Sequence, residues 1–447
     1  MRDLVVFVIF ITLLPSCFMR PWTGILVFSW FAYMRTQDLT WGFVRSLPLS
    51  QSVAIAMILG WLAWERRAVF RKDPRYFAIL FLVLWVGVSI AMNTVRWSVQ
   101  GWRYQDFMKV VFVAFLTGAL MNTRERARQI LLVICASFAF YGVKNGIYGA
   151  MGGKSITGPG GMLADNNDFA MAMVMNLPFL WYLAEDEKKR TRYGVLVYWG
   201  MRLAFVLTLF TIASTGSRGG FLTLVGVAFI MAMKTRYKVP ALAAGLVAGV
   251  IGLSVAPDEY RERLASILTR HDSSTLGRLT AWRVSINMAT ANPIFGVGYQ
   301  NTVYEYLRYL QGIDILEKDF TTHVSHNSYL QVWAETGTPS LIAFVFMLAS
   351  TQWLLWRIIR RARRTGQRWA ELYGHAIQVS LFAYMGGAMF LNRAHFDLVY
   401  QLVAIAVALP VVMLRDARPK RRTSFAAGMA PTASVSSRNP FQSVPSR

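Results

Sequence analysis

Three short polar motifs interrupt the apolar chain, and each carries side chains that could act on an anion. Arg218 stands in Ser-Arg-Gly-Gly between two apolar runs, and His326 opens His-Asn-Ser-Tyr-Leu before a third. Between them, Gly-Arg-Leu-Thr-Ala-Trp-Arg supplies Arg278 and Arg283. A guanidinium group binds phosphate oxygens at two points, and histidine is the side chain that most readily takes up a proton near pH 7. Together the motifs indicate a cationic, histidine-containing site.

Arg218 has two interpretations. Two glycines follow it, and at the start of a helix they allow close approach to a backbone whose free N–H groups favour anions. Alternatively, the side chain only reaches from an apolar run to the membrane surface. A lone arginine flanked by serine and glycine favours the first interpretation.

The sequence around Arg278 predicts an amphipathic helix over 278–291. Apolar residues recur in it at helical spacing: Leu279, Trp282, Ile286 and Ala289. Arg278 shares a face with Trp282, whereas Arg283 points elsewhere. The pattern fits a phosphate-binding helix and a solvated surface helix equally well.

His326 follows His323 by three residues, a spacing that could also suggest a metal. No Asp, Glu or Cys stands nearby at usual ligand spacing, so we expect no metal site and no cofactor. The two cysteines, Cys17 and Cys135, lie in apolar runs and indicate no disulfide framework. His326 is then either a general base or a hydrogen-bonded residue at the membrane surface.

The composition is that of a membrane protein. Of 447 residues, 55% are hydrophobic and 16% are charged, against about 25% in a typical soluble protein. Several apolar runs reach the roughly 20 residues that cross a bilayer. We therefore expect an all-α polytopic membrane protein with about 12 transmembrane helices and a helical periplasmic cap.

The net charge of +24 falls mainly in short basic loops, which mark the cytoplasmic side. This topology explains the charge, so no nucleic-acid partner is expected. It also places Arg218, Arg278 and His326 together on the periplasmic face, which suggests chemistry on a lipid-linked anion. The basic loops are 65–75, 122–128, 185–193, 234–238 and 357–371.

The chain is expected to divide into four parts. Residues 1–256 would contain transmembrane helices 1 to 9 or 10, 257–328 a large periplasmic loop, 329–414 the C-terminal transmembrane helices, and 415–447 a disordered basic cytoplasmic tail.

Residues 4–34 allow two topologies. One irregular crossing gives twelve spans and a cytoplasmic N-terminus, and a hairpin of two short helices gives thirteen and a periplasmic N-terminus. We expect twelve, although Arg20 in mid-membrane argues against a simple single span.

Three segments resemble the O-antigen ligase and polymerase family of bacterial inner-membrane glycosyltransferases. They are Ser-Arg-Gly-Gly (217–220), Gly-Arg-Leu-Thr-Ala-Trp with Asn-Pro-Ile-Phe-Gly-Val-Gly (277–298), and His-Asn-Ser-Tyr-Leu-Gln-Val-Trp-Ala-Glu-Thr-Gly (326–337). Residues 20–43 further resemble the O-glycosylation ligases associated with exosortase A. Asn-Asn-Asp (166–168) departs from the Pro-Asn-Asp often found in the family, which leaves the detailed structure of that loop open.

The resemblance implies transfer of a glycan from a polyprenyl-diphosphate carrier, such as undecaprenyl diphosphate, to an acceptor hydroxyl on protein, lipid or sugar. It implies inversion at the sugar, without metal, at the periplasmic face of the inner membrane. His326 would be the general base, and Arg218 and Arg278 would bind the diphosphate, joined by Arg283. Supporting roles would fall to His323, Asn327 and Asn166.

Two alternatives to a ligase stay open. A glycan polymerase would use the same scaffold with a lipid-linked acceptor, and the sequence does not separate the two. A polysaccharide or lipid transporter would need charged residues in mid-membrane and broken helices in matched halves. Most spans lack such residues, so this alternative is the weaker one.

Overall fold

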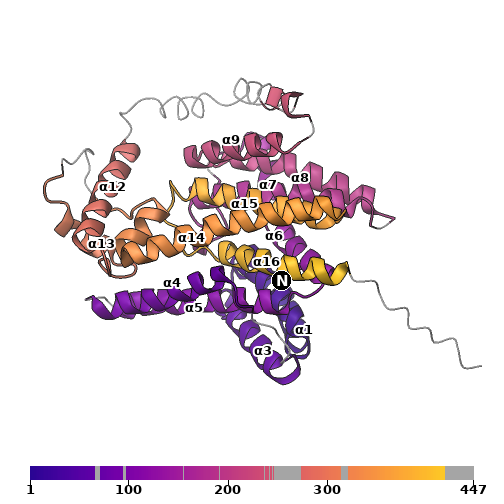
Figure 1. The fold of residues 1–447 in the computed structure, drawn as a ribbon, viewed down its shortest axis with the longest axis horizontal. Helices are drawn as coiled ribbons and strands as arrows, with labels where there is room; N and C mark the ends of the chain where they lie inside the picture. Colours follow the sequence, from indigo (N-terminus) through magenta and orange to yellow (C-terminus); the bar gives the residue numbers. More distant parts are fainter. Residues whose placement is uncertain are drawn as a thin grey trace, which may run out of the picture.

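A computed structural model describes residues 1–65, 71–93, 97–154, 156–190, 192–235, 237–240, 242–243, 245, 273–313 and 321–417. The regular elements in these ranges are helices (Figure 1). They are α1 (Arg2–Met19), α2 (Pro21–Met34), α3 (Leu49–Trp64), α4 (Pro74–Met92), α5 (Trp97–Leu120), α6 (Arg124–Ala150), α7 (Asn166–Glu187), α8 (Gly194–Ser214), α9 (Arg218–Met233), α12 (Ser273–Ala291), α13 (Thr302–Glu305), α14 (Ser328–Arg364), α15 (Arg368–Gly387) and α16 (Asp397–Asp416), with short 3-10 turns at Thr36–Leu39, Phe43–Ser46, Gly161–Leu163 and Tyr306–Tyr309.

Six described helices are long and apolar enough to cross a membrane: α1, α4, α6, α8, α14 and α16. Helices α3 and α9 are apolar but shorter. The expected class, an all-α membrane protein, is therefore confirmed. The number of crossings stays a prediction, because the apolar run 238–256 lies largely outside the described residues.

The segment 4–34 is not one irregular helix but two helices that meet at Arg20. The backbone N–H of Gly42, in the loop after α2, donates to the Asp3 carboxylate at 2.9 Å, so the start of α1 and the end of α2 lie at the same end of the molecule. The two helices are thus antiparallel, which favours the hairpin topology over our expected single crossing. Arg20 lies at the hairpin turn, where its charge avoids the apolar interior.

The centre of the bundle is formed by α7, α15 and α16, with the other long helices around them (Figure 1). In the apolar window of α16, 78% of the residues are buried, against 22% in α8 and 11% in α1. A helix that is apolar all round belongs in an interior, and α7 follows this rule with nearly every residue from Asp168 to Ala184 buried.

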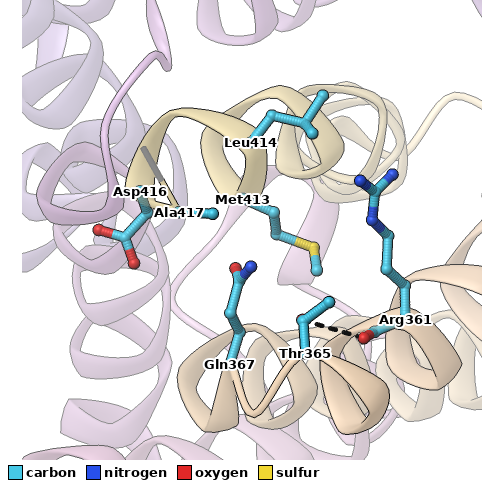
Figure 2. Close-up of a pocket in the computed structure, with 7 residues that line it drawn as sticks. All are labelled: Arg361, Thr365, Gln367, Met413, Leu414, Asp416 and Ala417. Carbon is cyan, nitrogen blue, oxygen red and sulfur yellow. Dashed lines mark hydrogen bonds between the residues drawn. The ribbon is translucent and has the colours of Figure 1, made fainter. Parts of the chain in front are cut away.

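Consecutive helices reverse direction, so the loops gather at two ends. We call one the basic end, because it holds the described parts of the predicted cytoplasmic loops 65–75, 122–128, 185–193 and 357–371. A shallow cavity of about 290 Å³ opens there between the α14–α15 turn and the end of α16 (Figure 2). It is lined by Arg361, Thr365, Gln367, Met413, Leu414, Asp416 and Ala417.

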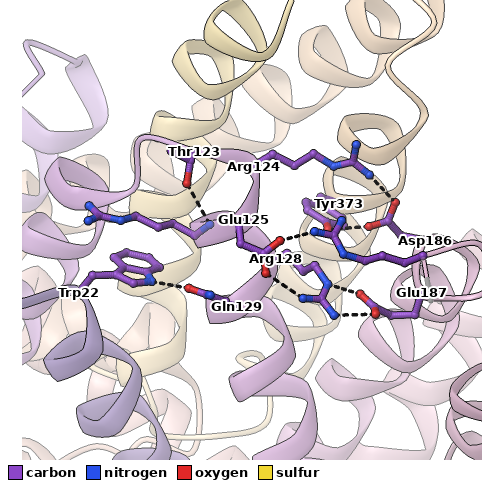
Figure 3. Close-up of polar contacts among 11 residues, drawn as sticks. Trp22, Thr123, Arg124, Glu125, Arg128, Gln129, Asp186, Glu187 and Tyr373 are labelled. Atoms are coloured by element: carbon purple, nitrogen blue, oxygen red, sulfur yellow. Dashed lines mark hydrogen bonds and ion pairs between the residues drawn. The ribbon is translucent and has the colours of Figure 1, made fainter. Parts of the chain in front are cut away.

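Ion pairs join the start of α6 to the end of α7 at the basic end (Figure 3). Arg128 donates to both oxygens of Glu187, at 2.5 and 2.7 Å, and Arg124 reaches Asp186 at 3.1 Å. The hydroxyl of Tyr373 on α15 also donates to Asp186, at 2.8 Å. These contacts fix three helices relative to one another at the end where the chain is most basic.

Helix α14 contains a break, and the segment after α12 fills it. Gly337 has φ 80 and ψ 178, and Pro339 follows inside the helix. Proline has no N–H to donate to the carbonyl four residues earlier, which is that of Glu335. The N–H of Gly298 donates to that carbonyl at 3.0 Å, and the N–H of Val297 donates to the carbonyl of Ala334 at 2.9 Å. Two of the motifs that carry the family resemblance therefore dock onto each other.

The described part of the predicted periplasmic loop contains both helices and irregular segments. The helix expected over 278–291 is the main part of α12, but its expected apolar face is only partly buried: Leu279 and Ile286 are exposed, whereas Ala281, Val284 and Met288 are buried. The helix expected at 301–311 is α13 followed by a 3-10 turn. Residues 257–272, 314–320 and the tail from 418 lie outside the described residues.

Candidate functional site

The starts of α7, α9 and α14 meet at the end opposite to the basic one, together with α12 and the connection 388–396. We call this the site end. The cavity near Arg361 is not part of it, because His326 and Arg361 lie at opposite ends of α14.

Arg218 is the first residue of α9, and the loop before α7 holds it in place. The Ser217 hydroxyl caps α9 by accepting from the N–H of Gly220 at 3.0 Å and donates to the Asn167 side chain at 2.7 Å. The amide of Asn166 donates to the carbonyl of Thr215 at 2.9 Å. Asn166 thus supports the backbone just before Arg218, and Asn167, which the sequence did not single out, contacts the cap itself.

The two glycines after Arg218 are needed for packing. A Cβ on Gly220 would lie 2.6 Å from the Cβ of Ala170 on α7, and one on Gly219 would lie 3.2 Å from Phe390. Contacts below 3 Å force a shift, so the glycine at 220 lets α9 lie directly against α7. The close approach at these glycines is therefore made by α7 and by Phe390, and the approach of an anion stays a prediction.

His326 precedes α14 in a left-handed backbone conformation, with φ 45. Such a conformation costs a non-glycine residue roughly 1–2 kcal/mol and indicates that the surroundings impose it. On one side, the hydroxyl of Ser285 on α12 donates to that of Ser325 at 2.9 Å. On the other, the Asn327 side chain caps α14 by accepting from the N–H groups of Tyr329 and Leu330 at 2.9 and 3.1 Å. Asn327 therefore positions the histidine.

Arg278 lies seven residues before Ser285, on the same face of α12, and this face is turned toward the His326 loop. Arg283 lies about 140° further round the helix. It is exposed, as are Leu279, Ile286 and Thr290 on the same side. The structure therefore brings Arg278 to the site end and leaves Arg283 on the outer face of α12.

Arg393, in the connection between α15 and α16, also belongs to the site end, and the sequence analysis missed it. Its guanidinium group contacts the buried carboxylate of Asp168 on α7 at 2.5 Å. The only signal in the sequence was the one already used for Arg218, a lone arginine in a short loop on the less basic side.

The electrostatics of His326 show which groups surround it. Burial, together with the nearby Arg278, His323 and Arg393, lowers the pKa of His326 from 6.5 to about 4, and Asp165 opposes this shift. At neutral pH the imidazole is therefore uncharged and can accept a proton. Four separate chain segments contribute to this environment.

The other histidines differ from His326. The ring of His323 lies 6.4 Å from that of His326, and its Nε2 lies 3.2 Å from the Thr321 hydroxyl. His395 packs edge-on against Phe107 and Tyr299, and burial lowers its pKa to about 3. In the described part of the chain, no group of three or more His, Cys, Asp or Glu side chains could hold a metal ion.

The described protein is thus an all-α membrane protein with a cationic site around a neutral, buried histidine. Residues 203–345 match the model of the O-antigen ligase family, and residues 1–187 match the model of a family of unknown function, DUF5935. No curated protein has significant sequence similarity to this chain.

Residues 203–345 are therefore similar to the O-antigen ligase family. The matched segment contains Arg218, Arg278 and His326, so the family assignment and the site rest on the same part of the chain. This similarity supports a membrane enzyme of glycan transfer that acts on a lipid-linked glycan.

Proposed function

We propose that this protein transfers a glycan from undecaprenyl diphosphate to an acceptor hydroxyl at the periplasmic face of the inner membrane, with His326 as the general base. One observation carries the proposal. His326 is held in a strained conformation, partly buried and uncharged at neutral pH, between arginines from two separate elements, Arg278 and Arg393. A base next to cationic groups is what transfer from a diphosphate requires.

The proposed step moves one proton and exchanges one bond. His326 accepts the proton of the acceptor O–H while that oxygen forms a bond to the anomeric carbon. The bond from this carbon to the diphosphate oxygen breaks, and the lipid diphosphate leaves with the electron pair. Attack opposite the leaving group inverts the anomeric centre. Arg278 and Arg218 stabilise the charge that grows on the departing diphosphate.

The low pKa of His326 gives the donor a second role. A base with a pKa of about 4 is uncharged at neutral pH but accepts a proton only weakly. A bound diphosphate brings negative charge next to His326 and offsets the arginines, which raises the pKa of the imidazole. His326 then becomes an effective base only when the donor is bound. Without the donor, it accepts protons weakly.

The orientation follows from the charge of the two ends. Basic short loops face the cytoplasm, so the basic end is assigned to the cytoplasm and the site end to the periplasm. The resemblance of residues 20–43 to exosortase A-associated O-glycosylation ligases supports a protein acceptor within this proposal. A polymerase would differ only in receiving the glycan on a second lipid-linked chain.

The test uses membranes that carry a labelled polyprenyl-diphosphate glycan and a suitable acceptor. We expect His326→Ala and Arg278→Ala, at equal expression, to abolish transfer and to leave labelled donor. Arg283→Ala changes an exposed arginine on the same helix and is expected to keep most of the activity. Full transfer by His326→Ala refutes the proposed base. The molecule labelled by the wild type separates ligase from polymerase, and no transfer by the wild type favours a transporter.

A further inference from the structure

The backbone of Arg393 is fixed by side chains from α14 and α15. Its N–H donates to the Ser328 hydroxyl at 2.9 Å, and its carbonyl accepts from the Tyr384 hydroxyl at 2.9 Å. The next N–H, of Ala394, donates to the Gln331 side chain at 3.3 Å. Ser328 lies two residues after His326, so the hydroxyl that anchors Arg393 also belongs to the start of α14.

The side chain of Arg393 is only partly used by its neighbours. Nη2 contacts one oxygen of Asp168 at 2.5 Å. Nε is buried and has no hydrogen-bond partner among the residues that the structure describes. A guanidinium group has five N–H donors in a planar fork, and a buried donor without a partner is costly. With 28% of its side chain exposed, Arg393 is accessible to a ligand at the site end.

We infer that Arg393 is a third anion-binding group of the site, which contacts the diphosphate of the lipid carrier, and that Asp168 positions it. The inference rests on the proposed function, since it adds a residue to the same donor site. Arg393 belongs to a segment outside the matched residues 203–345, and Asp168 belongs to α7, so the donor site extends beyond the family model.

The geometry explains why Asp168 positions Arg393 without preventing it from binding. Asp168 is 7% exposed and engages the guanidinium group through a single oxygen, whereas Arg128 and Glu187 at the basic end share two contacts. A one-point contact leaves the remaining N–H groups of Arg393 for phosphate oxygens.

A purely structural ion pair is the competing explanation, and a double variant separates the two. Suppose that the Arg393–Asp168 ion pair only holds α7 against the connection 388–396. Removing one partner then leaves a buried charge and impairs binding, and removing both partners restores much of that binding. If Arg393 binds the carrier, Arg393→Gln and the double variant Asp168→Asn/Arg393→Gln remain equally impaired. Asp168→Asn keeps the positive charge but not its position, so it is expected to weaken binding less.

The experiment measures binding of undecaprenyl diphosphate to the purified full-length chain in detergent, with the thermal midpoint recorded for each variant. We expect Arg393→Gln to weaken binding by about 10- to 100-fold, as for a lost hydrogen bond to a charged group. Arg393→Lys, which keeps the positive charge, should retain part of the affinity for the carrier. Arg202→Gln is the matched control, because Arg202 contacts Glu185 on α7 at the same 2.5 Å, far from the site end.

Several results would overturn the inference: wild-type binding in Arg393→Gln, recovery in the double variant, or a loss in Asp168→Asn as large as in Arg393→Gln. If Arg393→Gln does not fold, Asp168→Asn and Arg393→Lys still test the inference. Wild-type affinity in both variants would show that binding does not need a guanidinium group positioned by Asp168. If the wild type binds the carrier but transfers no glycan, the proposed transfer is refuted and the inferred binding role of Arg393 is not. A wild type that does not bind refutes both.

Discussion

Replacing Gly337 with alanine tests whether the break in α14 builds the site. Gly337 has φ 80 and ψ 178, a region that essentially only glycine occupies. A Cβ there would lie 2.1 Å from the carbonyl oxygen of Ile294 and 2.9 Å from that of Pro293. Both contacts are to backbone, so the segment 293–298 must move as a unit and no side chain can rotate away.

The magnitude follows from what this movement breaks. Backbone strain in this region costs about 1–3 kcal/mol. Three backbone hydrogen bonds join the break to the segment: Val297 to Ala334, Gly298 to Glu335 and Thr338 to Pro293, at 2.9, 3.0 and 2.8 Å. Each is worth about 1 kcal/mol, so Gly337→Ala should destabilise the protein by about 5 kcal/mol.

The assay compares thermal unfolding and glycan transfer for Gly337→Ala and Gly366→Ala. Gly366 also has positive φ, 67, but nothing lies within 4 Å of an added Cβ. It therefore reports the backbone strain alone, about 1–2 kcal/mol. We expect Gly337→Ala to lose far more stability and to lose transfer, because α12 and Arg278 are displaced. Equal effects of the two substitutions would refute the argument that close docking at Gly337 positions the site.

Three further predictions follow from the same structure. Gly220→Ala should push α9 away from α7 and raise the donor KM, whereas Gly226→Ala on the same helix, with open space around it, should not. Glu187→Gln should lower the stability by about 1–3 kcal/mol, because Arg128 loses the charge of its two-point partner but keeps its contact with Glu125, and thermal unfolding measures this. For His326, the lowered pKa predicts kcat/KM that is constant from pH 7 to about 5 and falls toward pH 4. The associated stabilisation is complete above pH 6.5 and is lost progressively as the pH falls from about 6.5 to about 4.

Patterns of local origin were predictable from the sequence. The helical spacing over 278–291 predicted α12, although not the face that it buries, and the described parts of four predicted basic loops lie at one end of the molecule. Helical periodicity also predicted that Arg283 points away from the face of Arg278, and Arg283 is exposed, whereas the preference for Arg278 came from the family resemblance. These features depend on residues within a few turns of one another, which is the range over which sequence patterns act.

Features that depend on distant segments were not predictable. Residues 293–298 read as a turn, and nothing local shows that their N–H groups replace helical hydrogen bonds forty residues later. Arg393 has no motif around it, and its place near His326 comes from hydroxyls on two other helices. The hairpin at Arg20 was left open because a short apolar segment with proline fits either one kinked span or two helices.

The two ends of the bundle are held together by different means, and this difference bears on function. At the basic end, Arg128 and Glu187 form a two-point contact, although Nε of Arg124 is also buried without a described partner. At the site end, backbone and hydroxyl hydrogen bonds hold a strained His326, and Arg393 keeps a buried donor without a described partner. Strain and unmet donors are tolerated where a ligand contributes the missing interactions. On this argument the bound donor should stabilise the site end more than the basic end, so hydrogen exchange should slow at the start of α14 and not at the α6–α7 contacts when undecaprenyl diphosphate is added.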